Sequence, residues 1–109
     1  MPRHFDLYDV SLKLIAELRP LLERLRQRDR DQAVQLKKAA NSILSNVAEG
    51  SRRQGRDRLQ CWNIAAGSAA EVRVQIEAAL AWGDLDHDFT ATALVLLDRA
   101  MAMLWRMTH

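Results

Sequence analysis

Apolar residues recur every three or four positions through four long segments of this chain, and this spacing is typical of helices rather than strands. The predicted helices cover about 7–27, 31–53, 57–82 and 87–107. Their apolar stripes are, in order, Leu7, Val10, Leu14, Leu18, Leu21 and Leu25; Leu36, Ala40, Ile43 and Val47; Cys61, Ala65, Ser68, Val72, Ile76 and Ala79; and Phe89, Ala93, Leu96, Ala100, Met103 and Met107. Short connections make successive helices antiparallel neighbours. The sequence therefore predicts an all-α fold, an antiparallel up-down-up-down four-helix bundle, as a single domain over residues 1–109.

Several residues predict where these helices begin, bend and end. Asp6 is the expected N-cap of the first helix, because its carboxylate can accept from the free N–H groups of the first turn. Pro20 lies inside the first pattern and predicts a kink or break near 16–20. The charged run 26–31 is the expected connection to the second helix.

Glycines mark the later boundaries. Either Gly50 or Gly55 is expected to end the second helix in a left-handed cap. Gly83 should end the third helix, and Asp86 should be the N-cap of the fourth.

Composition excludes several classes of protein. No run of residues approaches the roughly 20 apolar positions of a membrane span, and the first residues lack the apolar core of a signal peptide. The single cysteine, Cys61, cannot form an internal disulfide. We therefore expect a cytoplasmic protein with no membrane partner.

The third and fourth segments carry more apolar surface than one bundle core requires, since a core-facing helix uses roughly three positions in seven. The surplus residues are Trp62, Trp82, Leu94, Met101 and Trp105. Exposure of all of them to water would reduce solubility, which predicts a homo-oligomeric interface built from them. The alternative is that they pack beneath the loops of a monomer.

Polar side chains lie close to the apolar stripes of the second and third segments. They belong to Ser42, Asn46, Glu49, Ser68 and Glu71, and Gly67 lies among these residues and is included in the predicted set. Gly67 costs about 1 kcal/mol relative to alanine in a helix unless a neighbouring helix approaches closely. The pattern predicts a structural network in which Asn46 and Glu49 bond Ser68 or helix backbone.

An active site built from the same residues is less consistent with the sequence. The histidines, His4, His87 and His109, are not at the spacing of metal ligands, and no nucleophile, base and orienting group occur together. We therefore expect no enzyme activity, no cofactor and no metal.

Basic residues are distributed unevenly. Seven lie between Arg19 and Lys38 against three acids, whereas 71–98 holds six acids and only Arg73. This asymmetry favours an anionic partner, although a normally solvated surface would look the same. The candidate nucleic-acid contacts are Arg24, Arg26, Arg28, Arg30, Lys37, Lys38, Arg52, Arg53, Arg56 and Arg58. Aromatic residues are not interleaved with them, which argues against base stacking.

Two motifs in this chain resemble a known family. The run 35–50 (QLKKAANSILSNVAEG) is similar to the Q-hydrophobic-basic-basic-A-x-x-S-I-P-x-N-I-A-E-G signature of the four-helix-bundle proteins related to those encoded in 23S rRNA intervening sequences. The run 64–71 resembles the family's A-x-G-S-x-x-E element, and 80–85 its following turn. The resemblance covers about 7–107. Leu44 replaces the usual proline, so the family's kink is not expected here.

The resemblance implies a bundle that forms homopentamers with a central opening. It also implies kinship with the accessory protein of diversity-generating retroelements, a basic pentamer that associates with a reverse transcriptase and nucleic acid. The favoured hypothesis is a nonenzymatic oligomer that binds RNA or DNA, or serves a nucleic-acid-processing protein as an RNP accessory factor. The alternatives are a protein-interaction scaffold and a small enzyme or metal-dependent bundle using Glu49 and Glu71.

Overall fold

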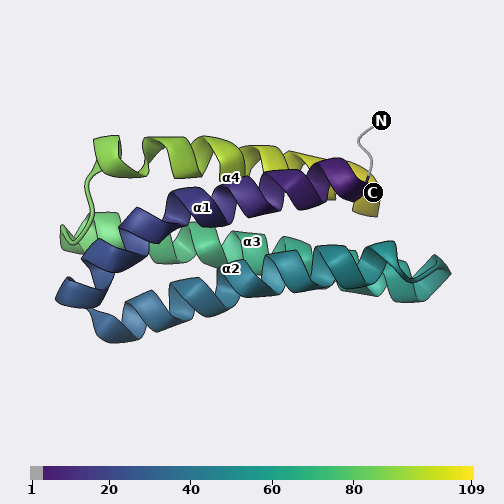
Figure 1. Cartoon of the computed structure of the whole chain (residues 1–109), viewed down its shortest axis with the longest axis horizontal. Coiled ribbons are helices and arrows are strands. Elements are labelled where there is room, and N and C mark those ends of the chain that lie inside the picture. Colours follow the sequence, from purple (N-terminus) through teal and green to yellow (C-terminus); the bar gives the residue numbers. More distant parts are fainter. Residues whose placement is uncertain (1–3) are drawn as a thin grey trace.

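The computed structural model describes residues 4–109, and this part of the chain forms four helices without a strand. They are α1 (His4–Arg28), α2 (Arg30–Ser51), α3 (Gly55–Trp82) and α4 (His87–Thr108). Each helix contacts the next, and α1 also contacts α4. The α1–α2 and α3–α4 connections lie at one end of an elongated molecule of 42 × 23 × 20 Å, and the α2–α3 connection lies at the other (Figure 1). The predicted all-α fold with four helices is confirmed, with boundaries within three residues of the prediction.

The predicted core is correct on α1 and α2, where every residue of both apolar stripes is buried. On α4 the prediction is only half right. Leu97 and Leu104 are fully buried, whereas Phe89, Leu96 and Met107 are partly exposed. Residues 93, 97, 100 and 104 also follow steps of four, three and four, so spacing alone could not identify which of two overlapping stripes faces the core.

Pro20 does not break α1, which continues from His4 to Arg28. Pro20 and Ala16, whose carbonyl loses its N–H partner, are both exposed. Water can therefore reach the freed carbonyl, and the proline ring faces solvent rather than a neighbouring helix. Of the predicted kink or break, the break is therefore wrong.

The first two helices also begin and end differently from the prediction. Because α1 begins at His4, Asp6 lies in its first turn and is not its N-cap. The charged run 26–31 belongs almost wholly to α1 and α2, with only Asp29 between them. The Asp29 side chain accepts from the backbone N–H of Gln32 at 3.1 Å and is the N-cap of α2. A single capping residue is therefore enough to reverse the chain.

Neither glycine ends α2 in a left-handed conformation. The helix ends at Ser51, and its C-cap, Arg52, has a right-handed backbone. Gly50 lies inside α2, buried against Trp62, and Gly55 begins α3 with a φ of 58°. The prediction for the next boundary is confirmed. Gly83 ends α3 at a φ of 79°, and Asp86 is the N-cap of α4.

Candidate nucleic-acid interface

The predicted basic residues do not form one surface. Arg26, Arg28 and Arg30 surround the α1–α2 connection, whereas Arg52, Arg53 and Arg56 surround the α2–α3 connection at the opposite end (Figure 1). All of them are exposed. The 22 residues of α2 lie between the two groups, a length of about 33 Å at the helical rise. Lys37 and Lys38 are exposed along α2 between these ends.

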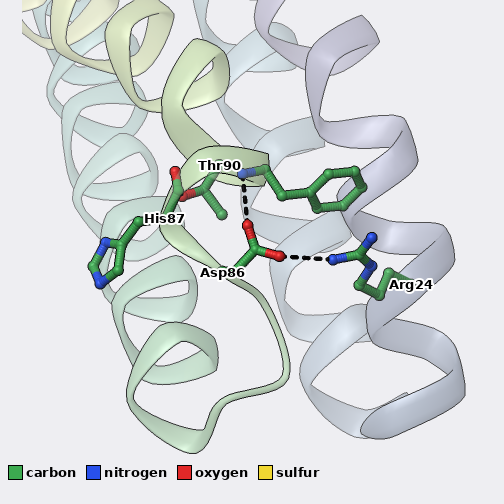
Figure 2. Close-up of polar contacts among 5 residues, drawn as sticks. Arg24, Asp86, His87 and Thr90 are labelled. Carbon is green, nitrogen blue, oxygen red and sulfur yellow. Dashed lines mark hydrogen bonds and ion pairs between the residues drawn. The ribbon is translucent and has the colours of Figure 1, made fainter.

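Arg24 is held within the chain by the start of α4 (Figure 2). One carboxylate oxygen of Asp86 accepts from the backbone N–H of Phe89 at 2.9 Å, and the other accepts from Nη1 of Arg24 at 3.1 Å. The Arg24 guanidinium also lies 3.8 Å from the centroid of the Phe89 ring, a favourable cation–π geometry. Thr90 completes this turn by donating its hydroxyl to the His87 carbonyl at 3.1 Å. Arg24 therefore ties α1 to α4.

Arg58 also has a structural role. Its Nε donates to the Gly50 carbonyl at 3.0 Å, and its Nη2 donates to the Ser51 carbonyl at 3.3 Å. These carbonyls belong to the last turn of α2, where helical C=O groups have no partner in their own helix. The last turn of α2 has no basic residue. Arg58, reaching from α3 across the Trp62 ring, supplies the positive charge that favours a helix C-terminus.

The remaining basic residues near the α2–α3 connection form what we call the hairpin tip, which consists of Arg52, Arg53 and Arg56. The tip extends past the neighbouring ends of α1 and α4 (Figure 1). Arg53 Nε pairs with Glu49 Oε2 at 2.9 Å, and this bond holds the pKa of the Glu49 carboxyl below its usual value. Among the described residues, Arg52 and Arg56 make no ion pair. Two exposed guanidinium groups are therefore available at the tip.

The predicted polar network is present in part. The Ser68 hydroxyl donates to Ser42 Oγ at 2.7 Å, which links α3 to α2. Asn46 donates to the Ser42 carbonyl at 2.9 Å and to Ser42 Oγ at 3.2 Å. Glu49 does not join this network, because it pairs with Arg53 on the solvent side of α2.

Glu71 belongs to a second polar chain. It accepts from Gln75 Nε2 at 2.8 Å, and Gln75 Oε1 accepts from Gln32 of α2 at 3.1 Å. Gly67 is exposed, and no atom lies within 4 Å of a Cβ built on it. The close approach predicted for Gly67 is therefore absent. It occurs at Gly50, where a Cβ would lie 2.5 Å from Trp62 Nε1.

Large apolar side chains remain exposed on α3 and α4. Trp82 is 78% exposed and Trp105 is 61% exposed, while Leu94 and Met101 are partly buried against the core. Trp62 differs from the prediction because it is only 6% exposed and packs against Gly50 in the core of a single chain. Four of the five residues predicted for an interface therefore keep solvent-accessible surface.

Features typical of two other function classes are absent from the described residues. Among the side chains that the structure describes, no group of three or more His, Cys, Asp or Glu residues could hold a metal ion. Over the same residues, no helix has both the length and the hydropathy needed to cross a bilayer.

Comparison with protein families gives one match. The model of the 23S rRNA-intervening sequence protein family matches residues 3–106, nearly the whole chain. The chain belongs to this family. Searches of curated proteins and of solved structures gave no significant match.

The 23S rRNA-intervening sequence protein motifs lie where α2 and α3 pack together. Ser42 and Gly50 come from the first motif, and Ser68 comes from the second. Leu44 replaces the proline of the motif, and α2 continues through it without interruption. These motif positions hold the bundle together, whereas Arg52 and Arg56 lie outside them.

Two structural contacts of this chain were missed by the sequence interpretation. The Gly50–Trp62 contact joins residues on different helices, so helical spacing gives no signal for it. The sequence did hold a weak indication of the bond from Arg58 to the end of α2. The last turn of α2 contains no basic residue of its own that could donate to the terminal carbonyls, so a donor from another helix could be expected.

Proposed function

We propose that this chain is a nonenzymatic, homo-oligomeric protein that binds RNA or DNA through the hairpin tip. In this proposal an antiparallel up-down-up-down bundle assembles into a homopentamer. It serves a nucleic-acid-processing protein in the cytoplasm as an accessory factor. The observation that carries the proposal is that Arg52 and Arg56 are exposed at the projecting end of α2 and α3 and make no ion pair among the described residues.

The number of unpaired guanidinium groups at the hairpin tip determines how strongly one copy can bind a nucleic acid. One copy offers two unpaired guanidinium groups at its tip, enough for only weak contact with phosphates. Several copies in a closed assembly would repeat these contacts and raise the overall affinity without any new contact type. Because phosphates carry no sequence information, the complex should depend strongly on salt and weakly on sequence.

Fluorescence anisotropy with labelled single-stranded RNA and duplex DNA tests this proposal. We expect binding at low salt that weakens as salt rises. Arg52→Ala/Arg56→Ala should weaken binding to every nucleic-acid sequence tested. The steepness of log K against log salt should also fall by about 0.9 for each duplex phosphate that the protein no longer neutralises. Arg28→Ala/Arg30→Ala removes the same charge at the opposite end and is the matched control. Absence of binding at low salt, or equal effects of both variants, would contradict the proposal.

A protein-interaction scaffold is the second candidate, and the exposed Trp82 and Trp105 side chains favour it. Exposed aromatic residues are enriched where proteins meet other proteins. Affinity capture from lysate with and without nuclease separates the two functions. A partner retained after nuclease treatment favours a scaffold, whereas one that disappears with the nucleic acid favours the first proposal.

A further inference from the structure

An apolar groove of about 240 Å³ lies between α1 and α2. Leu18, Leu22 and Ala40 are its buried apolar residues, and Ile15 adds a half-buried side chain. We refer to this feature as the α1–α2 groove. Ala40 is small, which leaves space between the two helices that a side chain from outside could fill.

Three cations border this groove, and no carboxylate of the described residues lines it. They are Arg19, Arg26 and Lys37. Arg19 pairs with Glu23 at 3.3 Å, whereas Arg26 and Lys37 make no ion pair within the same part of the chain. The groove therefore suits an apolar group that carries negative charge beside it.

The same chain presents such a group. Trp82 is the most exposed large hydrophobic residue of the described chain, at 78%. It is the last residue of α3, and Gly83 then turns the chain toward Asp84 and Asp88. Neither carboxylate makes an ion pair among the described side chains. Asp84 and Asp88 follow Trp82 closely in the sequence. An exposed indole followed by free carboxylates complements an apolar groove bordered by free cations.

We propose that Trp82 of one copy occupies the α1–α2 groove of the next copy. Asp84 and Asp88 then face Arg26 and Lys37 across the contact. This inference rests on the homo-oligomer of the proposed function and names the surfaces that form it. Because the two surfaces differ, every copy can engage one neighbour through its Trp82 and another through its groove. Such a head-to-tail contact gives a ring when the rotation between copies closes.

Two variants remove one surface each without touching the buried core. Trp82→Ala removes the inserted side chain. Arg26→Glu/Lys37→Glu reverses the charges beside the groove, and both residues are exposed. Light scattering coupled to size exclusion at micromolar concentration should show the oligomer for the unmodified chain and a monomer for each variant. Circular dichroism should show the same helix content in all three.

Mixing the two variants is the decisive measurement. Trp82→Ala keeps an intact groove, and Arg26→Glu/Lys37→Glu keeps an intact Trp82, so an equimolar mixture can form one good contact and no more. We expect the mass of a heterodimer. If Trp82 and the α1–α2 groove are not partners, the mixture stays monomeric, and that result would overturn the inference.

Controls separate this inference from the proposed function. Arg52→Glu/Arg56→Glu makes the same change of charge at the hairpin tip and should abolish nucleic-acid binding while leaving the oligomer intact. Ile64→Ala, in the first half of α3 and 47% exposed, should also leave it intact. A monomeric unmodified chain would overturn the homo-oligomer and this inference together. An oligomer unchanged by Trp82→Ala and by Arg26→Glu/Lys37→Glu would overturn this inference alone.

Discussion

Replacing Gly50 by alanine would place a methyl group in space that Trp62 already occupies. A Cβ at Gly50 would lie 2.5 Å from Nε1 and 2.6 Å from Cδ1 of the Trp62 ring, and 3.3 Å from Cβ of Cys61. Trp62 is 6% exposed, so its ring has little room to move away. The substitution must therefore separate α2 from α3 locally or move Trp62 out of its rotamer.

Two opposing free energies decide the size of the effect. Overpacking a well-filled core typically costs about 1–3 kcal/mol. Alanine in place of glycine inside a helix contributes about 0.5–1 kcal/mol in the other direction. Gly50→Ala should therefore lower the free energy of unfolding by about 1 kcal/mol, and by about 2.5 kcal/mol at most. For a domain near 100 residues, each 1 kcal/mol corresponds to a shift in Tm of roughly 4–8 °C.

Gly67→Ala is the matched control, because the same methyl group is added inside a helix. Nothing lies within 4 Å of a Cβ at Gly67, so only the helix-propensity gain should act. We expect Gly67→Ala to raise the free energy of unfolding by about 0.5–1 kcal/mol. Urea unfolding followed by circular dichroism, at one protein concentration for all variants, measures both changes.

The opposite signs are the critical result. If Gly50→Ala were as stabilising as Gly67→Ala, the close contact with Trp62 would not exist. A double-mutant cycle with Trp62→Phe adds a second check, because the smaller ring should relieve part of the clash and make the two substitutions non-additive. Additive effects would show that the cost of Gly50→Ala arises elsewhere.

Three further predictions concern polar contacts that fix the ends of the helices. Arg58→Ala should lower the free energy of unfolding by about 1 kcal/mol, because two carbonyls at the end of α2 lose a charged donor, as chemical denaturation would show. Asp86→Ala should cost about 1–2 kcal/mol by the same assay through loss of the α4 N-cap; Asp86→Asn keeps an acceptor and should cost less. Carbon-detected NMR titration should give Glu49 a pKa below 4.5 that rises in Arg53→Ala. Because the folded-state pKa is lowered, this pair stabilises the fold above the ordinary pKa of glutamate, and the stabilisation disappears as the pH falls through the lowered value.

The helices could be predicted from the sequence because their signals are local. Spacings of three and four positions placed all four segments, and Gly83 with Asp86 placed the α3–α4 connection. The errors occurred where two local signals compete. On α4 two overlapping stripes both satisfy helical spacing, and only packing against α1 and α3 selects Leu97 and Leu104 for the core.

Contacts between helices could not be predicted in the same way. Trp62 and Trp82 are the same residue type on the same helix, yet one is buried and the other is exposed. Trp62 is buried because Gly50 of α2 lies opposite to it. At Trp82 no residue of the described chain covers the ring. Which of two similar positions has a partner depends on how the helices cross, and helical periodicity does not contain that information.

Contacts between helices also decide which arginines of this chain are free to bind a partner. Arg24 and Arg58 would be classed from sequence with the nucleic-acid contacts, but both bind partners within the chain. Replacing either would weaken the fold, and any loss of binding would follow indirectly. Arg52 and Arg56 make no such bonds among the described residues, so their replacement should leave the unfolding free energy nearly unchanged. Stability measured beside binding therefore separates the arginines that build the bundle from those available to a partner.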